Sequence, residues 1–356
     1  MAKLPDITDP TLDAADKALE AAQDKSRRPY LGASAIGDPC ERKLWYSFRW
    51  TARPSFNALT LKRFEDGHRA EDIQADRLRM VDGIELITHG KDGRQMGFTS
   101  VHGHFKGHYD GIISGLLQAP KCTSIWEHKA TDEKKQAKLA KLKSEKGEKA
   151  ALKEWDEIYY GQAQIYMKAE GLTRHYLTCS SPGCRTTVSC RTDYCQEDAD
   201  ALEAKAERII ATDKPPIGIS KDPAFYLCKW CDFSAICYGD AIPEMNCRTC
   251  VFSKPIEGGQ WYCADQDIEL NPSHQELGCN RHLYIPALLP GDQTGASEES
   301  HAIQYQMGNV EYWNGPRGEN SYPSEELQHM KPALIGEAGI EGLRKEFGAV
   351  AVEVLA

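Results

Sequence analysis

Seven of the thirteen cysteines in this chain of 356 residues fall between Cys228 and Cys279. So dense a run of thiols is typical of a segment that is stapled by disulfides, binds metal, or buries cysteine as a small apolar residue. The polar, alanine-rich N-terminus (1–28) lacks the apolar core of a secretory signal, so we expect a reducing cytoplasm, where disulfides are rare. Thiolates kept as metal ligands are therefore the favoured explanation.

Spacing divides the cysteines into two sets of interest. The first set joins a compact Cys-x2-Cys-x5-Cys run to a cysteine far upstream: Cys40, Cys228, Cys231 and Cys237. The second set is spaced more loosely: Cys247, Cys250, Cys263 and Cys279. Four thiolates suit zinc and iron alike, so spacing alone leaves the first site open between a zinc ion and an iron–sulfur cluster. For the second set we expect zinc, with buried free cysteines as the alternative, because a segment with little apolar core needs a staple.

Charge and hydropathy exclude some classes of protein. No apolar run approaches the roughly 18–20 residues that span a bilayer, so we expect no membrane association. The formal net charge of −10 opposes a phosphate polymer, so any nucleic-acid site must be a local basic surface. Carboxylates that hold metal ions would add to the same negative total.

The order of periodic segments predicts an α/β fold. Helical spacing and N-cap signals predict helices over residues 11–25, from Ser34 through Phe48, and over 59–80, 131–170 and 197–211. Strand-like runs occupy 84–88, 95–102, 105–114 and 124–130, and a hairpin is expected over 174–178 and 186–191. This order favours a mixed sheet flanked by helices. The change of texture after Pro243 predicts a polar extension (1–29), a core (30–242) and a small cysteine-rich C-terminal domain (243–356).

Two successive strand-like runs carry acidic residues and a lysine. Asp110 stands near the end of GHYDG (107–111), and the next run contains WEHK (126–129). Glu127 and Lys129 are two residues apart, so in a strand their side chains leave the same face. If the strands are neighbours the three groups converge, and two hard carboxylates there would bind Mg²⁺ or Mn²⁺. The alternative is a turn aspartate beside a solvated strand face, because so short a motif often arises by accident.

Two helical segments carry further polar residues. GHRAE (67–71) precedes the strands and offers His68 and Glu71 on one face, and YGQAQIY (160–166) follows them with Gln162 and Tyr166 at i, i+4. Together with Asp110 and the Glu-x-Lys pair, this set in this order resembles the RecB-type branch of the PD-(D/E)XK nucleases, over about residues 30–240. The resemblance implies a restriction-endonuclease-like fold and metal-dependent cleavage of nucleic acid.

The resemblance also implies roles for single residues. By resemblance, the catalytic residues are Asp110, Glu127 and Lys129, and the lysine orients or helps to deprotonate the attacking water. By resemblance, the metal ligands are Asp110, Glu127, the backbone carbonyl of His128, and one residue of the preceding helix. That residue is Glu71, with His68 as the alternative. The residues beside the DNA strand become Gln162 and Tyr166.

The first cysteine set carries a second resemblance. Cys40 within DPCERKLWY (38–46), followed by the compact run, is similar to the iron–sulfur staple of AddB-type helicase–nucleases and of CRISPR-adaptation nucleases. It implies a 4Fe–4S cluster on Cys40, Cys228, Cys231 and Cys237 with a structural role, because the cluster would close a very long loop of the chain.

These expectations describe a DNA phosphodiester hydrolase that uses Mg²⁺ or Mn²⁺, with an exonuclease on single strands or duplex ends as the favoured form. Its setting would be replication, recombination or repair, beside proteins of those processes, in the host cytoplasm where the chain is phage-encoded. The alternative from another class is a non-catalytic, metal-stapled DNA-binding or assembly protein. A stretch with seven lysines and two glutamates (134–149) would be a basic rim for DNA or a solvated helix face.

Overall fold

The computed structural model describes residues 9–352, which fall into two compact units. Unit 1 contains the residues up to Arg27, Pro54–Phe98 and Gly107–Leu202. Unit 2 contains Arg28–Arg53, Thr99–Lys106 and the residues from Glu203 onward. The chain passes between the units several times, so this division differs from the single boundary that the change of composition near Ile242 predicts. Both cysteine sets belong to unit 2. Within residues 9–352 no helix is long and apolar enough to cross a bilayer.

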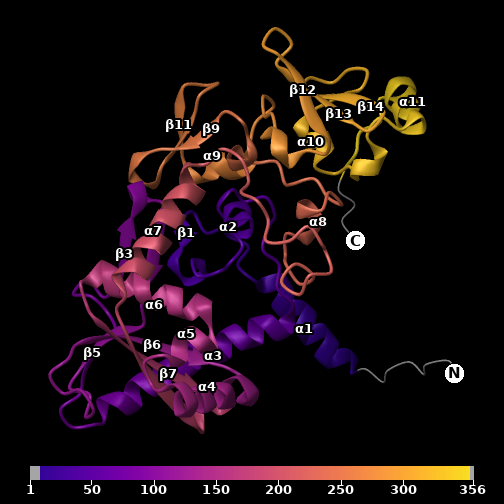
Figure 1. The fold of residues 1–356 in the computed structure, drawn as a ribbon. Helices are drawn as coiled ribbons and strands as arrows, with labels where there is room; N and C mark the ends of the chain where they lie inside the picture. Colours follow the sequence, from indigo (N-terminus) through magenta and orange to yellow (C-terminus); the bar gives the residue numbers. More distant parts are fainter. Residues whose placement is uncertain (1–8, 353–356) are drawn as a thin grey trace. The chain divides into compact units, whose positions relative to one another are not determined.

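A five-stranded mixed sheet forms the centre of unit 1 (Figure 1). Its strands, in spatial order, are β2 Glu85–Ile87, β5 Gly111–Ser114, β6 Ser124–Ala130, β7 Arg174–Ser180 and β8 Thr187–Asp193. β6 and β7 run parallel, and the other neighbours run antiparallel. The expectation of an α/β fold with mixed sheets flanked by helices is therefore confirmed.

Helices cover both faces of this sheet. On one face, α3 (Ala58–Arg79) packs Leu78 against Trp126 and Tyr176. On the other face, three helices surround a cluster that includes the strand residue Leu177. These helices are α4 Glu133–Lys146, α5 Ala151–Trp155 and α6 Glu157–Glu170. The first helix, α1 (Pro10–Ala22), packs on α3, where the Glu20 carboxylate accepts a hydrogen bond from the Ala58 N–H. Helix α7 (Gln196–Ala211) carries the chain onward from unit 1 into unit 2.

The helical stretch expected over 131–170 is divided into three helices by its own sequence. Helix α4 ends at Gly147, whose φ of 87° is a conformation that favours glycine. Asp156 then caps α6, because its carboxylate accepts hydrogen bonds from the backbone N–H groups of Ile158 and Tyr159. The chain thus turns back so that α6 lies on the sheet beside β6 and β7.

Unit 2 contains the shorter elements of the chain. They are β1 Leu31–Gly32, α2 Glu41–Phe48, α8 Ser234–Cys237, β9 Ser253–Pro255, β10 Trp261–Cys263, β11 Ile268–Leu270, α9 Pro272–Leu277, β12 Asp292–Ser297, β13 Ala302–Met307, β14 Val310–Asn314, β15 Ser321–Tyr322, α10 Ser324–Leu327 and α11 Ala338–Phe347. Strands β3 (Gly97–Ser100) and β4 (Phe105–His108) carry the chain from one unit to the other. Helix α2 begins after Pro39 and not at Ser34, because the residue before a proline disfavours the helical conformation.

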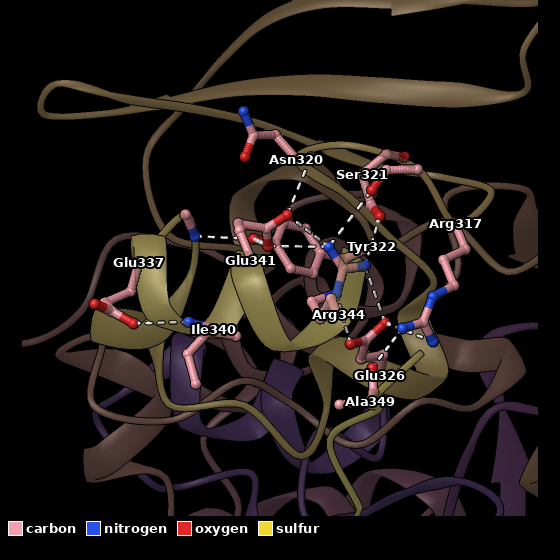
Figure 2. A network of polar contacts seen from close by, with 12 residues as sticks. Arg317, Asn320, Ser321, Tyr322, Glu326, Glu337, Ile340, Glu341, Arg344 and Ala349 are labelled. Carbon is pink, nitrogen blue, oxygen red and sulfur yellow. Dashed lines mark hydrogen bonds and ion pairs between the residues drawn. The ribbon is translucent and has the colours of Figure 1, made fainter. Parts of the chain in front are cut away.

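A buried ion-pair network fixes α11 to α10 and β15 (Figure 2). Arg344 donates to both oxygens of Glu326 at 2.9 and 3.1 Å and to Glu341 at 3.0 Å. Its guanidinium also lies 4.0 Å from the centroid of the Tyr322 ring. The side chains of Arg344 and Glu326 are only 5% and 6% exposed, so each charge depends on the other for compensation.

We predict that Arg344→Met lowers the free energy of unfolding by about 3 kcal/mol, because it leaves the buried Glu326 carboxylate with only the more distant Arg317 as a cationic partner. Arg317→Met is the matched control. Arg317 lies 3.9 Å from the same carboxylate but is 35% exposed, so we expect a loss below about 1 kcal/mol. Urea unfolding and hydrogen exchange of the β13 and β14 amides measure both effects. Equal losses in the two variants would contradict this account of the network.

Candidate active site

The pairing of β5 with β6 brings GHYDG beside the Glu-x-Lys pair. The backbone N–H of His128 donates to Asp110 Oδ2 at 2.7 Å, and the backbone N–H of Asp110 donates to Glu127 Oε1 at 3.3 Å. Lys129 Nζ donates to Glu127 Oε2 at 2.8 Å. The structure thus places the carboxylates of Asp110 and Glu127 and the ammonium of Lys129 together.

The single strand expected over 105–114 is broken at Tyr109 and Asp110. The Tyr109 N–H donates to the Met96 carbonyl at 3.2 Å, so β4 ends there and β5 begins two residues later. The glycine after the aspartate is required by packing, because a Cβ on Gly111 would lie 2.8 Å from the Ile87 carbonyl oxygen. The break leaves Asp110 outside both strands, with its carboxylate on the backbone of β6.

Burial and like charge dominate the electrostatics of this site. Glu127 is 3% exposed, and its pKa is raised to about 8, first by burial and then by the neighbouring Asp110 carboxylate. Burial also raises the pKa of Asp110. Burial lowers the pKa of Lys129, but the facing Glu127 and Asp110 outweigh it and raise the pKa, so the side chain remains an ammonium. One ammonium is therefore shared by two carboxylates.

Helix α3 adds a third acid to the surroundings. Half-buried Glu71 has its pKa raised to about 7, first by burial and then by the charge of Asp110. The exposed His68 acts in the opposite sense, and its charge lowers the pKa of Asp110. Both side chains of α3 thus lie within electrostatic reach of Asp110, and the local surplus of negative charge grows with Glu71.

The donors at this site fit a small divalent cation. Mg²⁺ is usually held by one or two carboxylates, with waters and substrate phosphates completing its shell. In residues 9–352 no three His, Cys, Asp or Glu side chains gather closely enough to hold an ion by themselves. The larger ligand set that the resemblance implies, with Glu71 or His68, is therefore not assembled, and Asp110 and Glu127 are the pair that the structure offers.

The other face of β6 is structural. The ring nitrogens of His128 lie 2.9 Å from Thr178 Oγ1 and 3.0 Å from Ser180 Oγ, both on β7. Burial, followed by the charge of Lys129, lowers the pKa of His128 to about 4, so its ring is neutral. The side chain of His128 therefore points away from the site, although its backbone N–H holds Asp110.

Gln162 and Tyr166 of α6 form a buried pair. Gln162 Nε2 donates to the Tyr166 hydroxyl at 3.0 Å, and that hydroxyl donates to the His108 carbonyl at 2.7 Å. The side chains are 4% and 1% exposed, so in this conformation they present no surface to a DNA strand. They hold the end of β4, two residues before Asp110, and so position the acid.

All four thiols of the first cysteine set line one cavity in unit 2. The cavity is small, about 50 Å³, and is also lined by Arg42 and Lys43. Arg42 Nη1 lies 3.5 Å from Cys237 Sγ, and the hydroxyl of Tyr238 bonds to Cys228. The four thiols therefore lie around one small cavity beside two cations, although, as elsewhere in residues 9–352, no group of three ion-binding side chains is assembled there.

The four thiols of the second set are also neighbours in unit 2. Burial, and then the proximity of Cys279 and Cys263, raise the pKa of Cys247 to about 12. Burial raises the pKa of Cys250 to about 12 as well, although backbone N–H groups donate to its sulfur. The thiols of Cys247 and Cys250 are therefore held in the protonated form, and within residues 9–352 no ion-binding group of three is assembled.

One residue of the site was not predicted from the sequence. The ring of Tyr159, in the first turn of α6, has its centroid 5.1 Å from Lys129 Nζ and 4.8 Å from Lys135 Nζ. The sequence carries only a weak signal for this residue, an aromatic three positions before Gln162. Its role depends on how α4 and α6 pack, which residue spacing does not reveal.

Comparison with known proteins gives structural likenesses only. No family model matches the sequence, and no curated protein matches it. The fold is similar to the crystal structure of an alkaline exonuclease from Laribacter hongkongensis, with 15% identity and a TM-score of 0.37 over 55% of this chain and 91% of that one. The same exonuclease in complex with dAMP matches with 14% identity, a TM-score of 0.37 and the same coverage. A structure of SSO0001 matches with 17% identity and a TM-score of 0.35 over 64% of this chain and 95% of that one. TM-scores below 0.5 do not establish a shared fold, so the function is inferred from the side chains of the site.

The raised pKa values of Glu127 and Glu71 predict how the metal-free protein responds to pH. Between about pH 4.5 and 8 the folded protein keeps protons that the unfolded chain has lost, so stability falls as the pH rises. In chelator we expect the melting temperature to fall by roughly 2–5 °C between pH 5 and pH 8. Glu127→Gln should flatten this slope, whereas Glu145→Gln, an exposed acid on α4, should not. If the melting temperature of Glu127→Gln falls with pH as steeply as that of the wild type, the pKa of Glu127 is not raised by its surroundings.

Proposed function

We propose that the protein is a metal-dependent deoxyribonuclease of restriction-endonuclease-like architecture, with Asp110, Glu127 and Lys129 as its catalytic residues. The observation that carries this proposal is that backbone N–H groups hold the half-buried Asp110 carboxylate and the buried Glu127 carboxylate side by side, at 2.7 and 3.3 Å, while Lys129 donates to Glu127 at 2.8 Å. A structural ion pair needs one acid for one base. A second buried acid is costly unless a cation or a reacting group compensates it, which is typical of catalytic sites.

In this proposal each side chain has its own task. Asp110 and Glu127 would hold Mg²⁺ or Mn²⁺, and such an ion supplies positive charge to a phosphate and lowers the pKa of bound water. Lys129, held as an ammonium by Glu127, orients the attacking water or a phosphate oxygen by donating hydrogen bonds. Tyr166, whose pKa burial raises, stays protonated and keeps the segment before Asp110 in place. The site would thus be organised before the substrate arrives.

The finer parts of the proposal concern the substrate. We take DNA as the substrate, with single strands or duplex ends as its favoured form and 5′-phosphates on the products. The setting that follows is DNA replication, recombination or repair. The rival from another class, a metal-stapled DNA-binding or assembly protein without activity, needs no second buried acid at this point of the sheet.

The cysteine sets are proposed as structural metal centres. For the first set we propose a 4Fe–4S cluster, supported by the cavity that the four thiols share and by Arg42 and Lys43, which would offset the charge of thiolates. For the second set we propose zinc, supported by the proximity of the four thiols and by the backbone N–H groups that donate to Cys250. Neither centre takes part in hydrolysis.

We predict that Asp110→Asn and Lys129→Met each lower the rate of Mn²⁺-dependent cleavage of labelled DNA by roughly 10²- to 10⁴-fold while DNA binding is retained. The control is Lys121→Met, an exposed lysine in the connection before β6, which should cleave at the wild-type rate. Tight binding without cleavage by the wild-type protein, in Mg²⁺ and in Mn²⁺, would overturn the proposal in favour of the non-catalytic rival.

For the metal centres we predict that anaerobically purified protein is brown and contains about four iron atoms and one zinc ion per chain. Cys231→Ser should remove the iron and the colour but leave the zinc, and Cys263→Ser should remove the zinc alone. Elemental analysis measures both metals. Zinc in place of iron at the first cysteine set would exclude the cluster. If Cys263→Ser retains its zinc, the second cysteine set does not hold zinc through Cys263. Cys122→Ser, outside both sets, serves as the control.

A further inference from the structure

The strand that carries the candidate catalytic residues leads directly into a lysine-rich helix. β6 ends at Ala130, and Asp132 already caps α4, so the first turn of α4 lies only a few residues from Lys129. The connection is fixed, because the Thr131 N–H donates to the Ser180 carbonyl at 3.0 Å. The start of α4 therefore has a definite place beside the site.

The lysines of this stretch differ in how they are neutralised. Within the described residues, four of the seven form ion pairs with carboxylates: Lys135, Lys141, Lys143 and Lys149. The other three are exposed and have no recorded ion pair: Lys134, Lys138 and Lys146. Lys134 and Lys138 lie one turn apart in the half of α4 that begins beside β6. Two of the exposed lysines without an ion pair thus lie in the first half of α4, where the N-cap carboxylate of Asp132 is within electrostatic reach of Lys134, and Lys146 lies at the far end.

A second observation links this half of α4 to Lys129. Lys135 Nζ and Lys129 Nζ lie 4.8 and 5.1 Å from the centroid of the same Tyr159 ring, which holds both ammonium groups by cation–π attraction. Trp155 supports the arrangement, since its ring lies 5.6 Å from that of Tyr159 and its Nε1 donates to the Lys135 carbonyl at 2.8 Å. The two cations are therefore held at a fixed separation, one inside the site and one at its rim.

We propose that the first half of α4, with the exposed Lys134 and Lys138, is a subsite for the backbone of a single DNA strand and holds the phosphate next to the one that is cleaved. A row of lysines beside an ammonium in the site matches a chain of evenly spaced negative charges. Tyr159 is a positioning residue that keeps the ammonium groups of Lys129 and Lys135 at a fixed separation. The subsite would therefore bind the charged DNA backbone and would not distinguish between bases. This inference rests on the proposed nuclease function.

The charge of the subsite is tested by salt dependence. Full-length Asp110→Asn protein is titrated with a fluorescent single-stranded oligodeoxynucleotide at several salt concentrations, alone and with the pair Lys134→Gln and Lys138→Gln. We expect the slope of log affinity against log salt to fall by about 1.4, at about 0.7 for each lysine lost, and the affinity to fall roughly tenfold. The matched control is Lys141→Gln with Lys149→Gln, which removes the same charge from two lysines that already have carboxylate partners. Its slope should stay unchanged.

The positioning role of Tyr159 is tested by kinetics. Tyr159→Leu removes the ring and should raise KM and lower kcat several-fold each, whereas Tyr159→Phe keeps the ring face and should restore both. Melting temperatures of the two variants separate this effect from a loss of folding.

The outcomes separate the subsite from the nuclease function. Equal loss of slope in both lysine pairs, or loss in neither, overturns the subsite while leaving cleavage by the wild type intact. Absence of cleavage by the wild type, with unequal slopes for the two pairs, refutes the nuclease and keeps α4 as a DNA contact. Equal kinetics for Tyr159→Leu and the wild type refute the role of the ring.

Discussion

The central constraint of unit 1 is that the buried Glu127 carboxylate and the half-buried Asp110 carboxylate lie side by side with one ammonium, that of Lys129, which donates to Glu127. Asp110 and Glu127 are held close by backbone N–H groups and by the packing of β5 on β6, so they cannot move apart without breaking the sheet. Lys129 relieves only part of the repulsion between them. A protein does not keep such an arrangement for stability, because apolar side chains of similar volume would fill the same space at lower cost. Under the proposed function, this surplus charge is what would attract a cation, and the strands on both sides keep it in place.

Strand β6 performs two tasks, and its register separates them. Glu127 and Lys129 leave one face, whereas Trp126 and His128 leave the other and pack with α3 and β7. Trp126 and His128 share Thr178 as a hydrogen-bond partner, which fixes the strand on its structural face. A slip of one residue would turn the acids into the α3 core and the tryptophan into the site. The burial of Trp126 therefore determines the position of Glu127, although the two side chains do not touch.

The periodicity of apolar residues in the sequence was enough to predict much of the fold of unit 1. The strands of the five-stranded sheet, the α/β class and the shared face of Glu127 and Lys129 follow from alternation with a period of two, and α3 and α7 follow from helical spacing. The seven short strands β9 to β15 were not predicted. The boundary near Ile242 was predicted from local composition, whereas the two compact units are assembled from segments that are distant in sequence, which composition does not reveal. The burial of Gln162 and Tyr166 could not be predicted either, since i, i+4 spacing defines a helix face but not what covers it. Tyr159 was missed for the same reason: its partners Lys129 and Lys135 lie on other elements, and only packing brings them to one ring.

The first cysteine set has a consequence for the candidate site through chain connectivity alone. Its thiols come from residue 40 and from residues 228–237, and every candidate catalytic residue lies in the chain between them. A group bound to all four thiols would therefore close a loop that contains the whole five-stranded sheet. Closing so long a loop removes more freedom from the unfolded chain than closing a short one, with a gain that grows as the logarithm of loop length. If the proposed cluster binds there, it would support the proposed active site without any electronic role, because two close carboxylates need stability supplied from elsewhere in the chain.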